Sequence, residues 1–208
     1  MKFPKRTDSL KEAGNSSFMT LQIGILGLQG CCKPHELKLK QLNVQSTRVI
    51  YPEQLFKVDA LIIPGGESST MLKTQTSGLW QALLEFGQSK TIWGICAGSI
   101  LLSKKTINPE QDSLGLLDID ITRNAYGAQN ESFIKTIEIQ LNPTIEESCI
   151  FIRAPKISRT GVDINHLAYD NGNVVMLENE LHMASTFHPE LGQSNRIHQY
   201  FLEKAIQG

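Results

Sequence analysis

The sequence has 208 residues, 40% of them hydrophobic, and a formal net charge of −1, which is enough apolar material for one domain with a full core. The near-neutral charge gives no electrostatic reason to expect a nucleic acid or a membrane surface as a partner, because both usually require a basic patch. No segment approaches the roughly 20 apolar residues of a membrane span, so we expect a cytoplasmic protein.

The first 19 residues differ in composition from the rest of the chain. They are polar, carry four basic side chains and lack the continuous apolar stretch of a secretory signal. We expect residues 1–19 to be a disordered extension, with Met19 as an alternative start. Residues 20–208 are expected to form a single domain, because no linker, repeat or low-complexity tract divides them.

From residue 21 the first half of the chain alternates apolar strands with helical stretches. We predict strands at 21–28, 44–50, 59–64 and 91–95 and helices at 35–42, 77–86 and 97–103. Strand-helix-strand units cross over right-handedly and cover both faces of a sheet. The pattern therefore predicts a central, mostly parallel sheet between two helical layers.

Strand-like segments dominate the second half. They lie at 116–122, 132–141, 148–153, 163–169, 173–179 and 181–187, before a final helix at 194–206. Asn171 and Gly172 predict a hairpin turn between two of them. We therefore expect a single three-layer α/β domain whose mostly parallel sheet carries antiparallel additions from the second half.

The cysteines do not follow a disulfide or zinc pattern. They are Cys31, Cys32, Cys96 and Cys149, and none belongs to a C-x-x-C pair. The stretch CCKPH brings His35 near two thiols as conceivable metal ligands, but adjacent cysteines at a strand-to-helix junction are more often packed thiols. We predict no metal site.

The stretch GICAGS, residues 94–99, places Cys96 between two glycines where an apolar strand gives way to a helix. In G-x-S-x-G hydrolases the nucleophile occupies such a tight turn, and small neighbours allow its strained backbone. The first turn of the following helix favours a thiolate there. The pattern equally fits a core thiol beside a tight turn, since cysteine is among the most buried residue types.

The stretch FHPEL, residues 187–191, offers a base for such a thiol. Pro189 favours extended backbone at His188, and in an extended segment residues two apart point the same way. His188 and Glu190 are therefore predicted to form an imidazole oriented by a carboxylate, which fixes the tautomer and stabilises the imidazolium. Alone, this motif is more often a turn than a catalytic pair. Its occurrence together with the cysteine turn favours the catalytic interpretation.

Gly65 and Gly66 end another apolar strand, within LIIPGGESST, before a polar helix start at Ser68 or Ser69. Adjacent glycines let a backbone N–H turn toward a ligand, as an oxyanion hole requires. Their place one strand before the cysteine turn predicts that both lie at the same carboxyl edge of a parallel sheet. The alternative is a plain strand-to-helix loop with Ser68 as the N-cap.

Six short segments follow one another in the order GILGLQG, LIIPGGESST, GICAGSILL, TRNAYGAQ, FIRAPKI and FHPEL. In this order they resemble the glutaminase subunits of pyridoxal phosphate synthase, which are class I, triad-type glutamine amidotransferases. The resemblance runs from about residue 20 to the C-terminus. The cysteine turn and the HPE motif are shared by triad amidotransferases, whereas LGLQG, PGGES and RAP narrow the resemblance to the vitamin B6 family.

The resemblance implies roles for individual residues. The nucleophile falls on Cys96, and its partners fall on His188 and Glu190. The glutamine-binding positions are Gly66, Glu67, Ser68, Arg123, Ile152 and Arg153, and the oxyanion and gating region holds Gly65, Gly66, Ala97 and Gln29. A free amino acid presents a carboxylate suited to arginine and an ammonium suited to glutamate, which agrees with these residue types.

The resemblance also implies a reaction and a partner. L-Glutamine would be hydrolysed to L-glutamate and ammonia through a thioester, with no metal or cofactor in this step. A barrel-shaped synthase subunit, in a large hetero-oligomer, would use the ammonia to make pyridoxal phosphate. Two alternatives are the glutaminase of another pathway, such as that of imidazole glycerol phosphate synthase, and a non-catalytic scaffold of the same fold.

Overall fold

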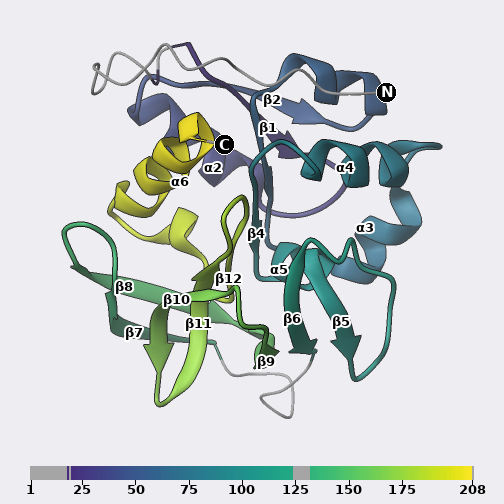
Figure 1. The fold of residues 1–208 in the computed structure, drawn as a ribbon. Helices are drawn as coiled ribbons and strands as arrows, with labels where there is room; N and C mark the ends of the chain where they lie inside the picture. Colours follow the sequence, from purple (N-terminus) through teal and green to yellow (C-terminus); the bar gives the residue numbers. More distant parts are fainter. Residues whose placement is uncertain (1–17, 19, 124–131, 208) are drawn as a thin grey trace.

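The computed structural model of the chain describes residues 18, 20–123 and 132–207 (Figure 1). The helices are α2 (Cys32–Gln41), α3 (Ser68–Thr74), α4 (Leu79–Gly87), α5 (Ala97–Leu102) and α6 (Arg196–Gln207), with 3-10 helices η1 (Pro52–Lys57) and η2 (Pro189–Leu191). The strands are β1 (Gln22–Leu26), β2 (Gln45–Val49), β3 (Ala60–Ile63), β4 (Ile92–Ile95), β5 (Ser103–Ile107), β6 (Leu117–Thr122), β7 (Ser132–Ile139), β8 (Ile145–Ile152), β9 (Lys156–Thr160), β10 (Asn165–Asp170), β11 (Asn173–Glu178) and β12 (Met183–Ser185).

A large sheet forms the centre of the fold. In the part of the chain that the structure describes, it has nine strands in the order β2-β1-β3-β4-β12-β11-β10-β7-β8. The strands from β2 to β12 run parallel, and β11, β10, β7 and β8 join them in antiparallel pairs. Strands buried on both faces read as continuous apolar runs, as in β3. The predicted parallel sheet with antiparallel additions is confirmed.

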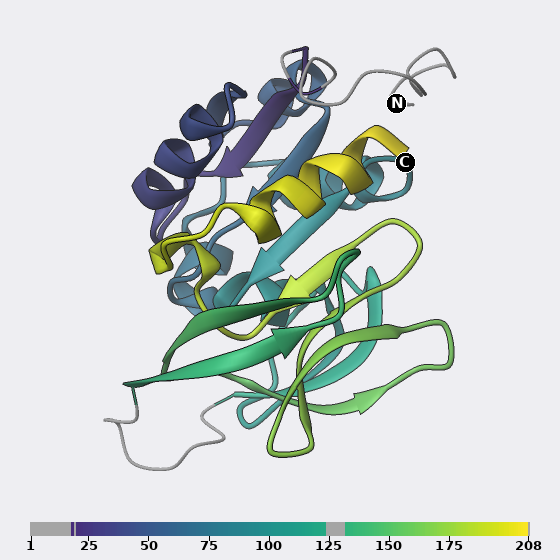
Figure 2. The ribbon, with the colours of Figure 1, turned by 90° about the vertical axis from the view of Figure 1, so that its left-hand side faces the viewer.

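Helices cover both faces of this sheet. Figure 2 looks onto the face covered by α2 and α6, where Ile62 and Phe201 belong to one apolar cluster. The helices α3, α4 and α5 cover the opposite face, where Leu61 and Leu83 belong to a second cluster. Neighbouring residues of a strand point to opposite faces, so β3 contributes to both clusters. The predicted three-layer α/β architecture is confirmed.

A second, smaller sheet was not predicted. Among the described residues it has three strands in the order β5-β6-β9, and it packs against the cluster that contains α5. Of these strands, β5 buries the polar Ser103 and Thr106, and β9 buries Ile157 alone. Since neither segment alternates apolar with polar residues, hydrophobic periodicity did not reveal β5 and β9.

Turn chemistry sets two of the element boundaries. The helix α2 begins at Cys32, three residues before the predicted start. Pro34 lies in its first turn, where its missing N–H removes no helical hydrogen bond. The predicted hairpin at Asn171 and Gly172 is confirmed, because both residues have positive φ, 47° and 77°, and they join β10 to β11.

Phe18 marks where the described part of the chain begins. Its side chain is 6% exposed and belongs to the apolar cluster beneath α2 and α6, and its carbonyl accepts the Leu21 N–H at 3.0 Å. The predicted extension, residues 1–19, otherwise lies outside the described residues. We propose that the domain begins at Phe18 and that the extension ends before it.

Removing Phe18 is expected to destabilise the domain. A chain that starts at Met19 should lose about 3 kcal/mol of unfolding free energy relative to one that starts at Ser17, the usual cost of deleting a buried phenylalanine side chain. Urea denaturation of the two purified proteins measures this difference. Equal midpoints would show that Phe18 contributes nothing to the core.

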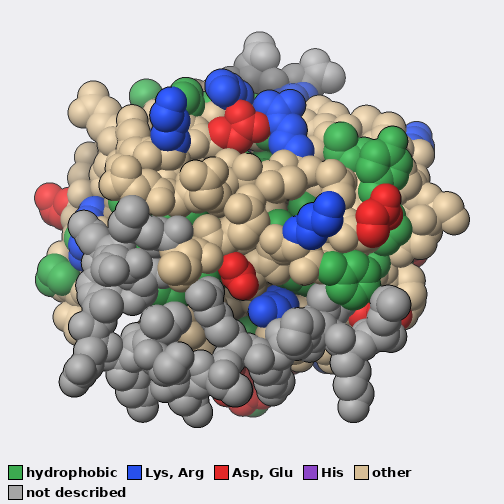
Figure 3. Space-filling model, turned by 90° about the horizontal axis from the view of Figure 1, so that it is seen from above, with side chains coloured by type: hydrophobic (Ala, Val, Ile, Leu, Met, Phe, Trp, Pro, Cys, Tyr) green, Lys and Arg blue, Asp and Glu red, His purple; other side chains and the backbone are tan. Residues whose placement is uncertain are grey.

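The surface carries charges of both signs. On the face seen in Figure 3, basic and acidic side chains of the described residues are interspersed. Within the described ranges, no helix is long and apolar enough to cross a bilayer.

Candidate active site

Parallel strands deliver the candidate residues to one edge of the large sheet. The strands β1, β3, β4 and β12 are neighbours and run in the same direction. The loops after their carboxyl ends carry Gln29, Gly65, Cys96 and His188. Ligands of open α/β sheets bind at this edge. The prediction that the glycine loop and the cysteine turn share one edge is confirmed.

Cys96 occupies a strained turn between β4 and α5. Its backbone has φ 48° and ψ −102°, which non-glycine residues rarely adopt. A Cβ at Gly94 would lie 2.5 Å from the Gly98 carbonyl oxygen, and one at Gly98 would overlap the Ile63 carbonyl oxygen. The Ser99 hydroxyl donates to the Cys96 carbonyl at 2.6 Å. Close backbone approach therefore requires both glycines, as a nucleophile elbow predicts.

His188 and Glu190 meet as predicted, but through a different backbone. Both side chains are buried, and His188 Nδ1 donates to Glu190 Oε1 at 2.7 Å because a carboxylate can only accept. The predicted extended segment is wrong beyond His188, since Pro189–Leu191 form η2. Proline at the first helical position has its φ already set for a helical turn. The chain therefore turns and brings the carboxylate back onto the ring.

The surroundings set the charges of this pair. Burial lowers the pKa of His188, but hydrogen bonds with Cys96 and Glu190 outweigh burial and raise it to about 10. Burial also opposes ionisation of Glu190, yet the hydrogen bond with His188, the largest opposing contribution, leaves the pKa of Glu190 lowered. An imidazolium is the form that pairs with a cysteine thiolate. Cys96, His188 and Glu190 thus form a candidate triad.

The other cysteines lack these features. All four thiols are free, and Cys32 and Cys149 are buried. Burial raises the pKa of Cys149 to about 12 and also raises the pKa of Cys32, so both remain protonated and unreactive at neutral pH. No group of three or more His, Cys, Asp or Glu among the described residues could hold a metal ion. Cys96 is therefore the cysteine that the fold places beside an acid-base pair.

The loop after β1 holds the glycine loop against the candidate triad. The Glu67 N–H donates to Gln29 Oε1 at 2.6 Å, and the Gly65 carbonyl accepts an N–H from the same loop at 3.0 Å. A Cβ at Gly65 would overlap His188 Cε1, and one at Gly66 would overlap Gln29 Oε1 and lie 2.9 Å from the backbone Cα of Gly30. Both positions therefore require glycine. Gln29 therefore contacts the glycine loop directly.

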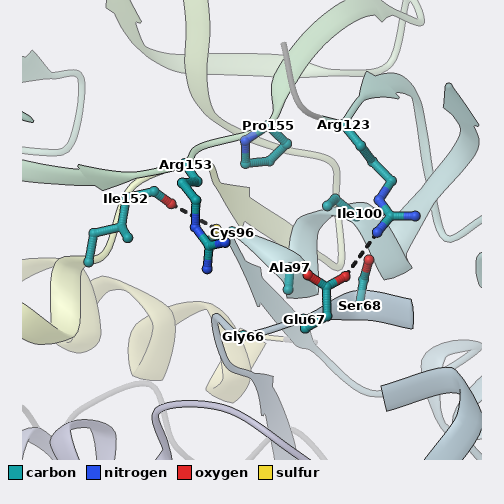
Figure 4. Close-up of a pocket in the computed structure, with 10 residues that line it drawn as sticks. All are labelled: Gly66, Glu67, Ser68, Cys96, Ala97, Ile100, Arg123, Ile152, Arg153 and Pro155. Carbon is teal, nitrogen blue, oxygen red and sulfur yellow. Dashed lines mark hydrogen bonds and ion pairs between the residues drawn. The ribbon is translucent and has the colours of Figure 1, made fainter. Parts of the chain in front are cut away.

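A pocket opens beside the candidate triad (Figure 4). Its lining includes every residue predicted to bind glutamine, together with Cys96 and Ala97. Sequence reasoning missed Ile100 and Pro155, which also line it. Ile100 lies one helical turn after Cys96, so the 3.6-residue period of α5 could have identified it. Pro155 follows the RAP arginine by two residues, and its place in that motif was the available signal.

Groups of opposite charge meet at this pocket. Arg123 Nη2 pairs with Glu67 Oε1 at 2.9 Å, as Figure 4 shows, and the Arg123 side chain is 12% exposed. The Ser69 hydroxyl donates to the same Glu67 oxygen at 3.0 Å, and the Ser68 hydroxyl donates to Gln111 Oε1 at 2.9 Å. The rest of the TRNAYGAQ motif, from residue 124, lies outside the described residues. The pair matches the opposite charges of a free amino acid.

The segment after β8 completes the pocket. Arg153 has a positive φ of 45°, an uncommon conformation for a residue with a side chain. Cys96 Sγ lies 3.9 Å from the Ile152 carbonyl oxygen, and Arg153 lines the same pocket as Cys96 (Figure 4). The kink at Arg153 thus lies beside a carbonyl that approaches the sulfur, and both residues of this segment line the pocket.

Known proteins share this sequence and fold. Residues 25–207 match the SNO glutamine amidotransferase family. The chain is 43% identical to the pyridoxal 5'-phosphate synthase subunit PdxT of Thermotoga neapolitana over 185 residues, covering 88% of this chain and 98% of that one. It is 42% identical to the subunit of the same name from Koribacter versatilis over 188 residues, covering 90% and 97% of the two chains. A crystal structure of a glutamine amidotransferase, 36% identical, superposes with a TM-score of 0.81 over 88% of this chain and 98% of that one. The chain therefore belongs to the SNO glutamine amidotransferase family.

Proposed function

We propose that the chain is the glutaminase subunit of a pyridoxal 5'-phosphate synthase and works in the cytoplasm. The observation that carries this proposal is Cys96 on its strained elbow beside the His188–Glu190 hydrogen bond. The names of the relatives from Thermotoga neapolitana and Koribacter versatilis support this pathway over that of imidazole glycerol phosphate synthase. The complete cysteine, histidine and glutamate set argues against a non-catalytic scaffold.

The pocket residues account for recognition of L-glutamine. The Arg123 guanidinium is suited to the α-carboxylate, and the Glu67 carboxylate is suited to the α-ammonium. These side chains pair with each other across the pocket, and the substrate zwitterion would take up both charges. Ser68, Ile152 and Arg153 line the remaining wall, which leaves the side-chain amide facing Cys96.

The first half of the reaction forms a thioester. The Cys96 thiolate attacks the amide carbon of the glutamine side chain, and a C–S bond forms as the carbonyl oxygen gains negative charge. The N–H groups of Ala97 and of the Gly66 region would hold this oxyanion; Ala97 is the first residue of α5, so its N–H lacks a helical partner. His188 gives its proton to the nitrogen, the C–N bond breaks and ammonia leaves.

The second half of the reaction hydrolyses the thioester. His188, now neutral, takes a proton from water, which attacks the thioester carbon. The C–S bond breaks, glutamate leaves and the thiolate returns. Glu190 keeps the His188 ring in the tautomer that both steps require. The chain's own residues supply every proton transfer in this scheme.

The fate of the ammonia suggests that a second enzyme receives it directly. Released into neutral water it would become unreactive ammonium, so its chemistry favours transfer inside a complex with the synthase subunit, in a large hetero-oligomer. The pair Gly65 and Gly66 can hold a peptide N–H away from the oxyanion at little steric cost and turn it inward when a partner presses on the loop. The isolated chain would then be a poor glutaminase.

Glutamate release by the purified chain, titrated with its synthase subunit, tests the function. We expect the subunit to raise kcat by about 10²- to 10³-fold, the usual effect of one oxyanion donor. Pyridoxal phosphate should form from glutamine only when both proteins are present. Absence of glutamate release under both conditions would refute the glutaminase assignment. Full activity without the subunit would refute the gating and leave the glutaminase intact.

A further inference from the structure

The Glu190 carboxylate has a second side that the proposed mechanism does not use. Its Oε1 accepts from His188, whereas its Oε2 is buried and has no hydrogen-bond partner among the described residues. The polar atom that faces Oε2 is His35 Nε2, 3.7 Å away, which is also buried and without a hydrogen-bond partner in the described part of the chain. Unpartnered polar atoms are expensive to bury, so this juxtaposition requires an explanation.

His35 is held in place from behind. Its Nδ1 lies 3.0 Å from His198 Nε2, and both rings are fully buried. Both rings pack nearly perpendicular to Trp93, with ring centroids 6.0 Å and 5.0 Å from it. His35 comes from α2, His198 from α6 and Trp93 from β4, the strand that leads to Cys96. The two histidines therefore belong to the packed layer directly behind the candidate triad.

The protonation of both rings follows from their burial. Burial lowers the pKa of His35 to about 4 and the pKa of His198 well below 6.5. The charged groups that face them are Glu190, His188 and Lys38, whose ammonium donates to the carbonyls of residues 192 and 194. Both imidazoles are therefore neutral at pH 7, and each carries a single N–H.

The hydrogen-bond partners then fix the tautomers. A carboxylate can only accept, so His35 must carry its proton on Nε2 to face Glu190 without repulsion. His35 Nδ1 is then an acceptor, and His198 Nε2–H must be its donor. The opposite tautomers would point a lone pair of His35 at the Glu190 carboxylate. One arrangement of protons, with N–H groups directed from His198 to His35 to Glu190, satisfies both of these contacts and leaves His198 Nδ1 as an acceptor without a partner among the described residues.

We propose that His35 is a positioning residue of the candidate triad, holding the Glu190 carboxylate through its Nε2–H, and that His198 fixes the required tautomer. The separation of 3.7 Å exceeds a normal hydrogen bond by about 0.8 Å, so the Nε2–H attracts the carboxylate electrostatically across this gap while Oε1 keeps its bond with His188. The proposal rests on the proposed function. When His188 gives its proton to the leaving nitrogen, its attraction for Glu190 falls. A second N–H keeps the carboxylate ionised and in place through that step.

Substitutions at His35 separate this role from a structural one. His35→Met fills the space without an N–H, and His35→Gln places an amide N–H near the position of Nε2. With saturating synthase subunit, we expect His35→Met to lower kcat up to about 100-fold with KM unchanged, as displacement of a catalytic group does. His35→Gln should restore most of kcat. His198→Met should also lower kcat, but less strongly. It removes the donor that fixes the His35 tautomer but keeps the His35 ring.

The pH profile provides the readout that packing alone does not move. Without the His35 N–H, protonation of Glu190 becomes easier, so the acidic limb of kcat/KM should move to higher pH in His35→Met. The pH dependence of Cys96 alkylation by iodoacetamide should shift to higher pH in the same way. This measurement does not require glutamine. His182 is the matched control, because it is buried, has a pKa lowered to about 4, and accepts the Ile92 N–H away from the triad. His182→Met should lower Tm and leave both profiles unchanged.

Three results would overturn or uphold the positioning role. Wild-type kcat and pH profiles in His35→Met would overturn it. Equal losses in His35→Met and His35→Gln, with a lower Tm and an unshifted acidic limb, would also overturn it and leave a packing role. Shifted profiles in His35→Met, rescue by His35→Gln and unshifted profiles in His182→Met would uphold it. An inactive wild-type complex would instead refute the proposed function, while the alkylation profiles would still test His35.

Discussion

Replacing Cys96 with alanine is expected to lower glutamate release by about 10⁴-fold or more, because loss of a covalent nucleophile removes most of the catalysis that the triad provides. The fold should survive. Alanine has the same Cβ as cysteine, so it meets no new contact at φ 48°, and the glycines at 94 and 98 that form the elbow remain. Glutamate release with saturating synthase subunit measures the loss, and circular dichroism with Tm measures the fold.

Cys149→Ala is the matched control for this variant. Cys149 is also buried, but it lies on β8, and burial raises the pKa of its thiol to about 12. Its removal should lower Tm modestly and leave kcat near the wild-type value. A diazoketone analogue of glutamine should label the wild type and Cys149→Ala, and fail to label Cys96→Ala. Glutamate release by Cys96→Ala at a rate near wild type would exclude Cys96 as the nucleophile.

The sequence was most informative where the chain obeys local rules. The apolar runs of β1, β3 and β4 and the glycines around Cys96 predict strand, turn and helix from short-range sterics. They also locate the elbow, since a parallel sheet gathers the carboxyl ends of its strands at one edge. The strands β5 and β9 escaped prediction because their stability comes from pairing with β6 and from packing on the apolar cluster that contains α5. Neither contribution is visible in a five-residue pattern.

In the candidate site, too, local motifs were predictable and contacts that depend on tertiary packing were not. Cys96 and the pair His188 and Glu190 were predicted from motifs, and the structure brings these residues together. The reason for the contact between His188 and Glu190 was wrong, because Pro189 starts a 3-10 turn that an i, i+2 argument for a strand does not anticipate. The contact of His35 with the far side of Glu190 joins residues 155 positions apart. No local pattern marks such a pairing, which depends on how α2 packs on the sheet.

His188→Asn is expected to lower glutamate release almost as much as Cys96→Ala does. The variant lacks both the acid that protonates the leaving nitrogen and the base that takes a proton from water. Glu190→Gln should be about 10-fold or more less damaging, because it disturbs the orientation and charge of His188 and leaves the ring in place. Single-turnover assays with glutamine and the synthase subunit measure both variants. A Glu190→Gln protein as inactive as Cys96→Ala would show that the carboxylate takes part in bond making.

The pH dependence of Glu190→Gln separates orientation from charge. His188 must be protonated to release ammonia, and the pKa of His188 is raised from 6.5 to about 10, against its burial, by hydrogen bonds with Cys96 and Glu190 and by the Glu190 charge. Because a neutral amide stabilises the imidazolium less than a carboxylate does, this pKa falls in the variant, and the basic limb of kcat/KM moves to lower pH. Activity is then lost at a pH where the wild type still works. An unshifted basic limb in an active Glu190→Gln enzyme would mean that Glu190 orients the ring without holding its charge.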